Sequence, residues 1–271
     1  MEEIIHVENL TKDYGHGRGI FDINLSVAKG EVFGFLGPNG AGKSTTIRHI
    51  MGFLKADKGQ CTVCGLDSWK DACKIKENVE YVPGEIAFPD LPTGTEFLKN
   101  QAELLGLKDM SKADKLIEKL QLDPSANLKR MSKGMKQKTA IVAALMADKD
   151  ILILDEPTTG LDPLMRLTFL DILKEEKARG KTIFMSSQMF DELETLCDRV
   201  AMILDGHIID IADVNAIKNR GFKTFKVEFI DETDYRNFKR RKFEIVRDQQ
   251  KYNQVTVKIA DDKVNTLFKA L

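Results

Sequence analysis

The sequence predicts an α/β fold, with a mostly parallel sheet at its centre. Two observations predict this sheet: a glycine-rich turn at 37–45 lies between an apolar run and a helical pattern, and strand and helix patterns alternate from 151 to 211. A third observation, a change of pattern after residue 220, predicts a separate small unit. We therefore expect an α/β domain at 1–220 and a small α+β appendage at 221–271.

Composition excludes several classes of protein. The 41 Lys and Arg nearly balance the 42 Asp and Glu, so no global field would attract nucleic acid or an acidic membrane surface. No apolar run approaches the ~18 residues of a membrane span, and the N-terminal residues contain no apolar signal core. Four cysteines in 271 residues are typical of a reducing compartment. We expect a cytoplasmic protein that binds no nucleic acid.

The alternating pattern of residues 3–33 predicts antiparallel strands. The segments IIHVENL and FDINLSV alternate apolar and polar side chains, and a glycine-rich turn at 15–19 separates them. Tyr14 ends the first of these segments. This part of the chain is therefore expected to form an antiparallel β subdomain beside the main sheet.

The glycine-rich turn has the residue types of a phosphate-binding loop. GPNGAGKST fits the spacing Gly, four residues, Gly, Lys, Ser or Thr, between the apolar EVFGFL and the helical pattern KSTTIRHIMGFL. The glycines let successive N–H groups face an anion, and the following helix adds its positive end. We expect Lys43 to reach the terminal phosphates of a nucleotide and Ser44 to bind Mg²⁺.

A C-x-x-C pair follows at Cys61 and Cys64. A zinc site would need two more ligands, and a redox pair should open a helix, whereas this pair lies in a strand-like stretch before a turn. We interpret both as small structural residues and expect no metal other than Mg²⁺.

The middle of the chain predicts a helical insertion. A turn-rich loop begins at Gly84, and helical periodicity follows at 97–105, 113–120 and 134–145. Few strand signals occur between them. We expect this insertion to cover about residues 85–147, between two parts of the α/β core.

Two carboxylates follow the apolar strand pattern ILIL at 151–154. Asp155 closes that strand, where it can hold Mg²⁺ directly or through water. Glu156 is expected to orient or deprotonate the water that attacks the γ-phosphate. The remaining core elements are expected at 164–178 (helix), 182–185 (strand), near 190 (helix) and 199–211 (hairpin).

Two further segments resemble those of a known family. MSKGMKQK at 131–138 is similar to the signature motif of ATP-binding cassette (ABC) ATPases, whose usual form is Leu-Ser-Gly-Gly-Gln, and DEPTTGLDP at 155–163 resembles their Walker B strand and the loop after it. The separation of Ser132 from Asp155 is the one expected for that family. With the phosphate loop, these motifs cover roughly residues 3–211. The chain is identified as a member of the ABC ATPases, which have a P-loop NTPase core.

The resemblance implies that two such domains clamp two ATP molecules head to tail. Tyr14 would stack on adenine, or else be an ordinary surface aromatic. Ser132 and Gly134 would contact the γ-phosphate that the opposite subunit holds, and Asp162 would support the contact between subunits. The residues expected to wrap the phosphates are Asn39, Gly40, Ala41, Gly42, Lys43, Ser44 and Thr45.

The sequence departs from the family pattern at three positions. The family has a Gln that touches Mg²⁺ and the attacking water where this chain has Gly84, and the neighbouring Glu85 could substitute for it. The family has a His that contacts the γ-phosphate where this chain has Gln188, which cannot carry a proton or a positive charge. Lys133 replaces a signature glycine, and either adds a cation near the phosphate or faces solvent.

The resemblance implies an ATP-hydrolysing subunit of an ABC exporter, most similar to bacterial drug, antimicrobial-peptide or toxin exporters. A separate permease would hold it on the inner face of the cell membrane and dock near residues 84–92. Phe88 and Leu91 are either contacts of that permease or anchors of the loop. The partner ATPase is a second nucleotide-binding domain, and we expect a homodimer, with a different partner chain as the alternative.

An alternative function is an ATP-gated binding or regulatory module with little or no hydrolysis. Gly84 and Gln188 favour it, and the intact Glu156 opposes it. The appendage offers a basic run at 239–242, which is either a docking patch or a solvated helix end.

Overall fold

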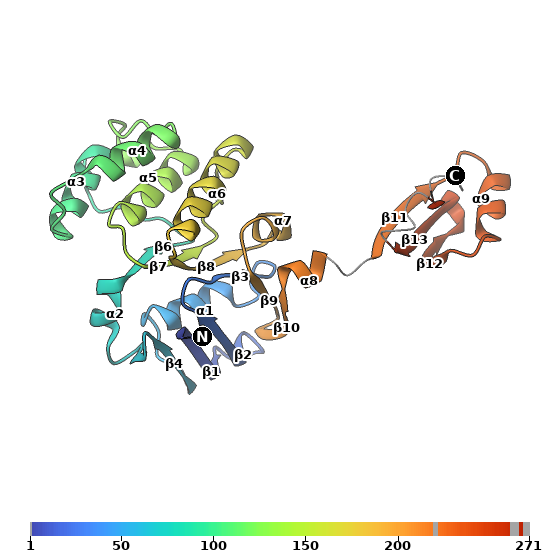
Figure 1. The fold of residues 1–271 in the computed structure, drawn as a ribbon, viewed down its shortest axis with the longest axis horizontal. Coiled ribbons are helices and arrows are strands. Elements are labelled where there is room, and N and C mark those ends of the chain that lie inside the picture. Colours follow the sequence, from blue (N-terminus) through green and yellow to red (C-terminus); the bar gives the residue numbers. More distant parts are fainter. Residues whose placement is uncertain (1, 219–221, 261–265, 268–271) are drawn as a thin grey trace. The chain divides into compact units, whose positions relative to one another are not determined.

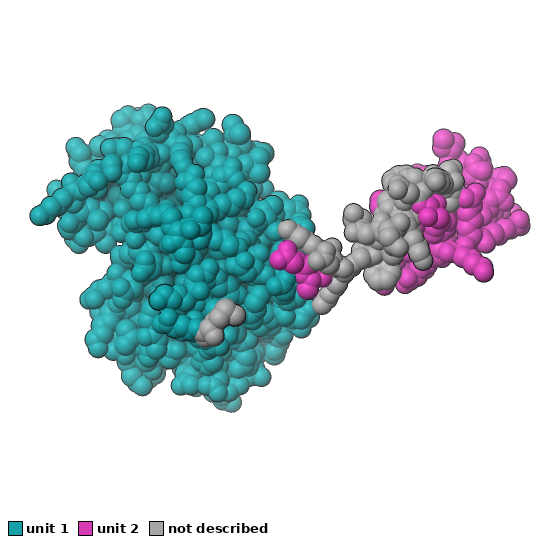
Figure 2. Space-filling view, in the orientation of Figure 1, with its two compact units in different colours: residues 1–214 teal, residues 215–271 magenta. Residues whose placement is uncertain are grey.

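The computed structural model describes residues 2–218, 222–260 and 266–267. The chain forms two compact units, Met1–Val214 and Asn215–Leu271, which are described separately below (Figure 2). The last helix of the appendage is predicted from the sequence over 262–271. Of these residues, Thr266 and Leu267 have helical backbone, and the others lie outside the described residues.

A six-stranded sheet lies at the centre of the first unit (Figure 1). Its order is β10-β9-β3-β8-β7-β6, and all neighbouring pairs are parallel except β9 and β10. Every residue of β7 and β8 is buried, as expected for parallel strands covered on both faces. The strands are β3 (Val32–Leu36), β6 (Val79–Val82), β7 (Ile151–Asp155), β8 (Thr182–Ser187), β9 (Arg199–Leu204) and β10 (His207–Asp213). The predicted α/β fold class is confirmed.

The helices of the core begin at local signals in the sequence. Asp162 caps α6 by accepting a hydrogen bond from the Met165 N–H (2.9 Å), and Pro163 occupies its first turn. Gly42 precedes α1 with a φ of 109°, a conformation that favours glycine. The core helices are α1 (Lys43–Ile50), α6 (Pro163–Ala178) and α7 (Phe190–Glu194).

A four-stranded antiparallel sheet, in the order β2-β1-β4-β5, packs its apolar side chains against α1 and the central sheet. Cys61 is buried in this sheet, and Cys64 is exposed in the turn after it with a φ of 53°. Both thiols are free, and no cluster of three metal-ligating side chains occurs within the described ranges. The strands are β1 (Glu3–Asp13), β2 (Gly19–Ala28), β4 (Lys58–Val63) and β5 (Leu66–Asp67).

Helices α3, α4 and α5 gather on one side of the central sheet and form the helical insertion (Figure 1). Phe97, Leu116 and Ile141, one from each helix, share an apolar core with α6 and the sheet. No described helix is both long and apolar enough to cross a membrane. The insertion contains α3 (Gly94–Leu104), α4 (Ser111–Lys119), the 3₁₀ helix η1 (Leu128–Arg130) and α5 (Lys133–Leu145). Helix α2 (Ala72–Asn78) precedes β6 and packs Ile75 into the core shared by α1 and the antiparallel sheet.

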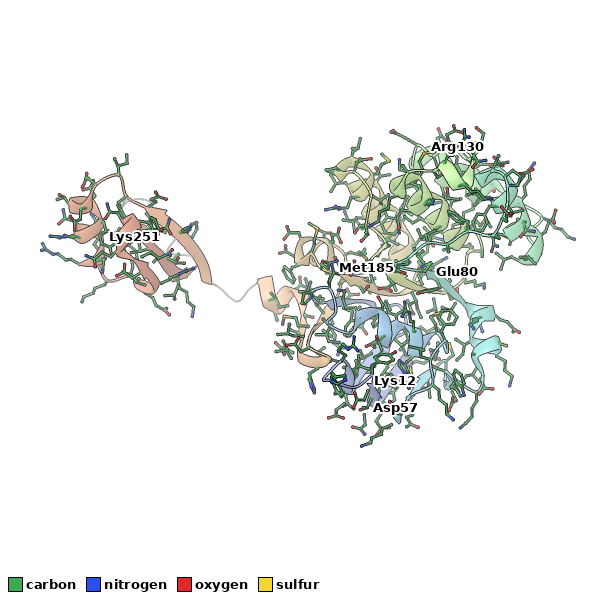
Figure 3. All side chains as sticks on the ribbon, turned by 180° about the vertical axis from the view of Figure 1, so that it is seen from behind. Lys12, Asp57, Glu80, Arg130, Met185 and Lys251 are labelled. Carbon is green, nitrogen blue, oxygen red and sulfur yellow. The ribbon has the colours of Figure 1, made fainter. Side chains whose placement is uncertain are left out.

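Glu80 is a buried carboxyl in β6 (Figure 3). Its Oε1 lies 3.5 Å from the Lys149 Nζ, which donates instead to the Lys76 carbonyl (2.8 Å). Burial raises the pKa of Glu80 from its ordinary 4.5 to about 7, and the positive charge of Lys149 only partly opposes this. Between pH 4.5 and about 7, Glu80 is therefore mostly protonated in the folded protein and mostly ionised in the unfolded chain.

Replacing Glu80 by Gln should stabilise the first unit at alkaline pH. Stability falls as the pH rises from the unfolded to the folded pKa of Glu80, because only the unfolded chain ionises readily in that window. The variant should gain about 3 kcal/mol in free energy of unfolding near pH 8 and less than about 1 kcal/mol near pH 5. Urea unfolding at the two pH values measures this, and an equal gain at both would contradict it.

The second unit is a three-stranded antiparallel sheet, in the order β11-β13-β12, with α9 packed on it. Tyr235 and Phe238 of α9 are buried against Val255 and Val257. Lys239 forms an ion pair with Asp248, and the rest of the basic run, 240–242, is exposed at the helix end. The elements are α8 (Val214–Lys218), β11 (Phe222–Glu228), α9 (Glu232–Lys239), β12 (Glu244–Gln249), η2 (Gln250–Tyr252) and β13 (Gln254–Ala260).

Candidate functional site

The glycine-rich loop connects β3 to α1 and folds around the Lys43 side chain. Lys43 is 4% exposed, and its Nζ donates hydrogen bonds to the carbonyls of Gly37 (2.6 Å) and Pro38 (3.0 Å). Gly40 has a φ of 81°, and a Cβ on Gly42 would lie 2.6 Å from the Ile20 side chain. The loop therefore requires glycine at both positions, and it holds a buried cation next to the helix N-terminus.

Glu156 lies directly after β7 and faces this cation. Its Oε1 is 3.0 Å from the Lys43 Nζ, and its Oε2 accepts hydrogen bonds from Gln188 Nε2 (2.7 Å) and Thr159 Oγ1 (3.3 Å). Burial alone would raise the pKa of Glu156, but the hydrogen bonds from Lys43 and Gln188 outweigh it, so the net pKa lies below the ordinary value. Glu156 is therefore a carboxylate at neutral pH, able to accept a proton or orient a water.

The Ser186 hydroxyl, at the end of β8, forms hydrogen bonds with both Asp155 and Glu156 at the end of the neighbouring strand β7. Ser186 Oγ donates to Asp155 Oδ1 (2.8 Å) and accepts from the Glu156 N–H (2.9 Å). A Cβ on Gly84 would lie 3.1 Å from Asp155 Oδ2, so the backbone of the 84–92 loop approaches that oxygen closely. A larger side chain at position 84 would have to push this carboxylate aside.

A polar cavity of about 350 Å³ lies where these groups meet. The structure places these predicted residues in its wall: Asn39, Ser44, Gly84, Glu85, Lys133, Asp155, Glu156 and Gln188. The wall also contains Arg48, Tyr81 and Thr159, which the sequence analysis missed. Arg48 follows Ser44 by one helical turn on α1, so helix periodicity could have found it.

The cavity has oxygen donors that fit a magnesium ion. Ser44 contributes a hydroxyl and Asp155 a carboxylate that is 2% exposed. Mg²⁺ prefers oxygen ligands and is commonly held by one or two carboxylates together with substrate phosphates, so a cage of protein carboxylates is not needed.

A second cavity, of about 290 Å³, also borders the phosphate loop. Gly40 and Thr45 line it together with Tyr14, Arg18 and Asp205. Tyr14 is 47% exposed, and its N–H donates to the Arg18 carbonyl (2.9 Å), which closes the turn before β2. The two cavities share the phosphate loop, and the sequence analysis identified Tyr14 but neither Arg18 nor Asp205.

The signature segment begins α5 and packs on the loop after β7. Ser132 caps the helix by accepting from the Met135 N–H (3.2 Å), and a Cβ on Gly134 would lie 2.7 Å from the Gly160 carbonyl. Gln137 Nε2 donates to the Pro157 carbonyl (2.7 Å). Lys133 is exposed and lines the cavity of its own chain.

Phe88 and Leu91 both pack partly buried against the apolar core of the insertion. The Phe88 ring meets Phe97 edge-on, with 4.7 Å between centroids. This supports the interpretation of both as loop anchors. Beside them is a groove of about 270 Å³ lined by Ile86, Pro89, Lys129 and Lys136, among others.

Comparison with known proteins adds evolutionary evidence. Residues 20–159 match the family described as ABC transporter. The chain is similar to the linearmycin resistance ATP-binding protein LnrL of Bacillus subtilis (38% identity over 77% of this chain and 68% of that protein). It is also similar to the bacitracin transport ATP-binding protein BcrA of Bacillus licheniformis (34% identity, 86% and 77%). A solved ATP binding subunit of an ABC transporter superposes with a TM-score of 0.72 and 29% identity, covering 79% of this chain and 92% of that one.

Proposed function

Because this chain belongs to the ABC transporter family, we propose that it hydrolyses ATP to drive export through a separate membrane permease. The observation that carries this proposal is that Glu156, in the wall of the polar cavity, contacts both Lys43 and Gln188. Phosphoryl transfer requires a cation that binds the phosphates and a carboxylate that orients the attacking water, and Lys43 and Glu156 are such a pair.

The residues divide the work by their chemistry. When ATP binds, its phosphates replace Glu156 as the partner of the Lys43 ammonium group, because both anions compete for that group. Glu156, released from that ion pair but still bonded to Gln188, orients the attacking water. Ser44 and Asp155 would hold Mg²⁺, which would supply positive charge to the phosphates. Tyr14 stacks on adenine in the second cavity.

Hydrolysis of Mg-ATP by the purified chain tests this function. Turnover that disappears in Glu156→Gln would support it. Tight ATP binding without turnover would instead favour an ATP-gated binding or regulatory module. That alternative is suggested by Gly84 and Gln188, which stand where the family has a glutamine and a histidine.

The proposed assembly contains two copies of the ATPase and a permease. Ser132 and Gly134 of one copy contact the γ-phosphate held by the other, and Asp162 supports that contact. The permease docks over the groove at the 84–92 loop and keeps the chain on the inner face of the cell membrane. The names of the relatives suggest an antibiotic as the exported substrate.

Replacing Gln188 by His should raise turnover by about tenfold, because a protonated imidazole adds positive charge near the γ-phosphate. A His at this position can still donate a hydrogen bond to Glu156, as Gln188 does now at 2.7 Å. Steady-state hydrolysis measures the effect, and Gln188→Ala is the matched control that should lower turnover. Lower turnover in the His variant would mean that the site has adapted around Gln.

A further inference from the structure

Gln188 lies in the short turn between β8 and α7, and a buried carboxyl group of α7 contacts that turn (Figure 1). The carboxyl group belongs to Glu192, which is 3% exposed. Burying an acidic side chain costs free energy unless the group is paired, so apolar packing alone does not account for a glutamate at this position. The proposed ATPase function assigns no role to Glu192.

The Ser187 hydroxyl connects Glu192 to the turn. Ser187 Oγ donates to Glu192 Oε2 (2.6 Å) and accepts from the Met189 N–H (2.9 Å). A serine hydroxyl that binds the N–H group two residues later forms a turn around the residue between them, which here is Gln188. A hydroxyl can rotate, so such a turn is weak by itself. Because Glu192 fixes the hydroxyl proton, a lone pair of the oxygen stays directed at the Met189 N–H.

Arg166 of α6 contacts the same turn from a second element. Its Nε lies 3.3 Å from Glu192 Oε1, and its Nη1 lies 3.2 Å from Met189 Sδ. Within the described residues neither Nε nor Oε1 has a hydrogen-bond partner, so this ion pair is an electrostatic contact. The positive charge of Arg166 offsets part of the cost of burying the carboxylate. Arg166 therefore touches both Glu192 and the residue that follows Gln188.

The strand end before the turn is fixed to the phosphate loop, whereas Gln188 itself is exposed. The Gly37 N–H donates to the Ser187 carbonyl (3.2 Å), and Gln188 Nε2 donates to Glu156 (2.7 Å). An exposed side chain has little packing to hold it in one direction, so the backbone of the turn decides where Gln188 points. The hydrogen bonds of the Ser187 hydroxyl hold that backbone.

We propose that Glu192 is a positioning residue for the reaction. Through Ser187 it holds the turn that directs Gln188 at Glu156. Without the carboxylate, the hydroxyl rotates, the turn loosens, and Gln188 is bonded to Glu156 for less of the time. The effect on turnover rests on the proposed ATP hydrolysis, but the direction of the Gln188 side chain can be measured without ATP.

Hydrogen exchange of the Gln188 side-chain amide, followed by NMR on the full-length protein, tests the geometry. The signal is identified by its loss in Gln188→Ala, and the bond to Glu156 should slow its exchange with solvent. Glu192→Leu removes the acceptor of Ser187 and should speed this exchange about tenfold. Glu192→Gln keeps an oxygen for Ser187 and should restore most of the protection. Asp191→Leu, which removes an exposed carboxylate from the same helix, is the matched control and should leave the exchange rate unchanged.

Steady-state hydrolysis tests the effect on turnover. Glu192→Leu should lower kcat about tenfold and leave KM for Mg-ATP unchanged, because Lys43 and the phosphate loop are intact. In a Gln188→Ala background the same substitution should have no further effect, whereas a merely structural role would lower kcat equally in both backgrounds. An unmodified protein without turnover would count against the ATPase function, and the exchange measurement would then decide the positioning role by itself.

Thermal unfolding checks that Glu192→Leu folds. If it does not, Ser187→Ala breaks the same hydrogen bond from the other side and should speed the Gln188 exchange alike. Unchanged exchange of the Gln188 amide in the folded variant would overturn the proposal. Additive effects of Glu192→Leu and Gln188→Ala on kcat would overturn it as well.

Discussion

Replacing Lys43 by Ala should reduce ATP affinity on the order of a hundredfold. The substitution removes a buried ammonium that donates to two loop carbonyls and lies 3.0 Å from Glu156. Charge-assisted hydrogen bonds contribute about 1.5–3 kcal/mol, so their loss to the phosphates accounts for an effect of this size. Without Lys43, Glu156 also loses its cationic partner, and its negative charge then repels the phosphates.

Calorimetric titration with Mg-ATP measures the change. Lys174→Ala is a matched control, since Lys174 is an exposed lysine that pairs with Asp171 on α6, outside the cavity. The control should bind ATP as the unmodified protein does. Unchanged affinity in the Lys43 variant would contradict the role of the loop in phosphate binding.

Replacing Glu156 by Gln should lower the hydrolysis rate by about 10²–10⁴-fold while ATP still binds. The amide keeps the shape of the side chain and can still accept from Gln188, but it cannot take a proton from water. The variant also removes the anion that competes for Lys43, so ATP binding should be at least as tight as before. ATP that binds and persists should then trap the proposed closed dimer.

Size-exclusion chromatography with Mg-ATP measures the dimer, and a phosphate-release assay measures the rate. Glu118→Gln makes the same chemical change at an exposed position of α4 and should leave both quantities unaltered. A Glu156→Gln variant that remains monomeric would count against the head-to-tail assembly. One that still hydrolyses ATP at the original rate would show that another group activates the water.

The sequence by itself determined the fold class and many of the local structures that form the polar cavity. The apolar run before Asp155 predicts the buried strand that the structure has, and the loop glycines and the helix cap at Ser132 depend on neighbours within a few residues. Such signals are local, because φ/ψ preference and capping involve residues close in the chain. Gln188 could be identified as a departure because the family resemblance places a His at that position, directly after a strand end.

Only the tertiary structure decided which of these residues touch. Strand order brings the C-terminal ends of β3, β7 and β8 to one edge of the sheet. Glu156 can therefore form an ion pair with Lys43 and accept a hydrogen bond from Gln188. The same packing makes Lys133 line the cavity of its own chain. These results depend on contacts between distant segments, and a linear pattern of residue types contains no distances between such segments.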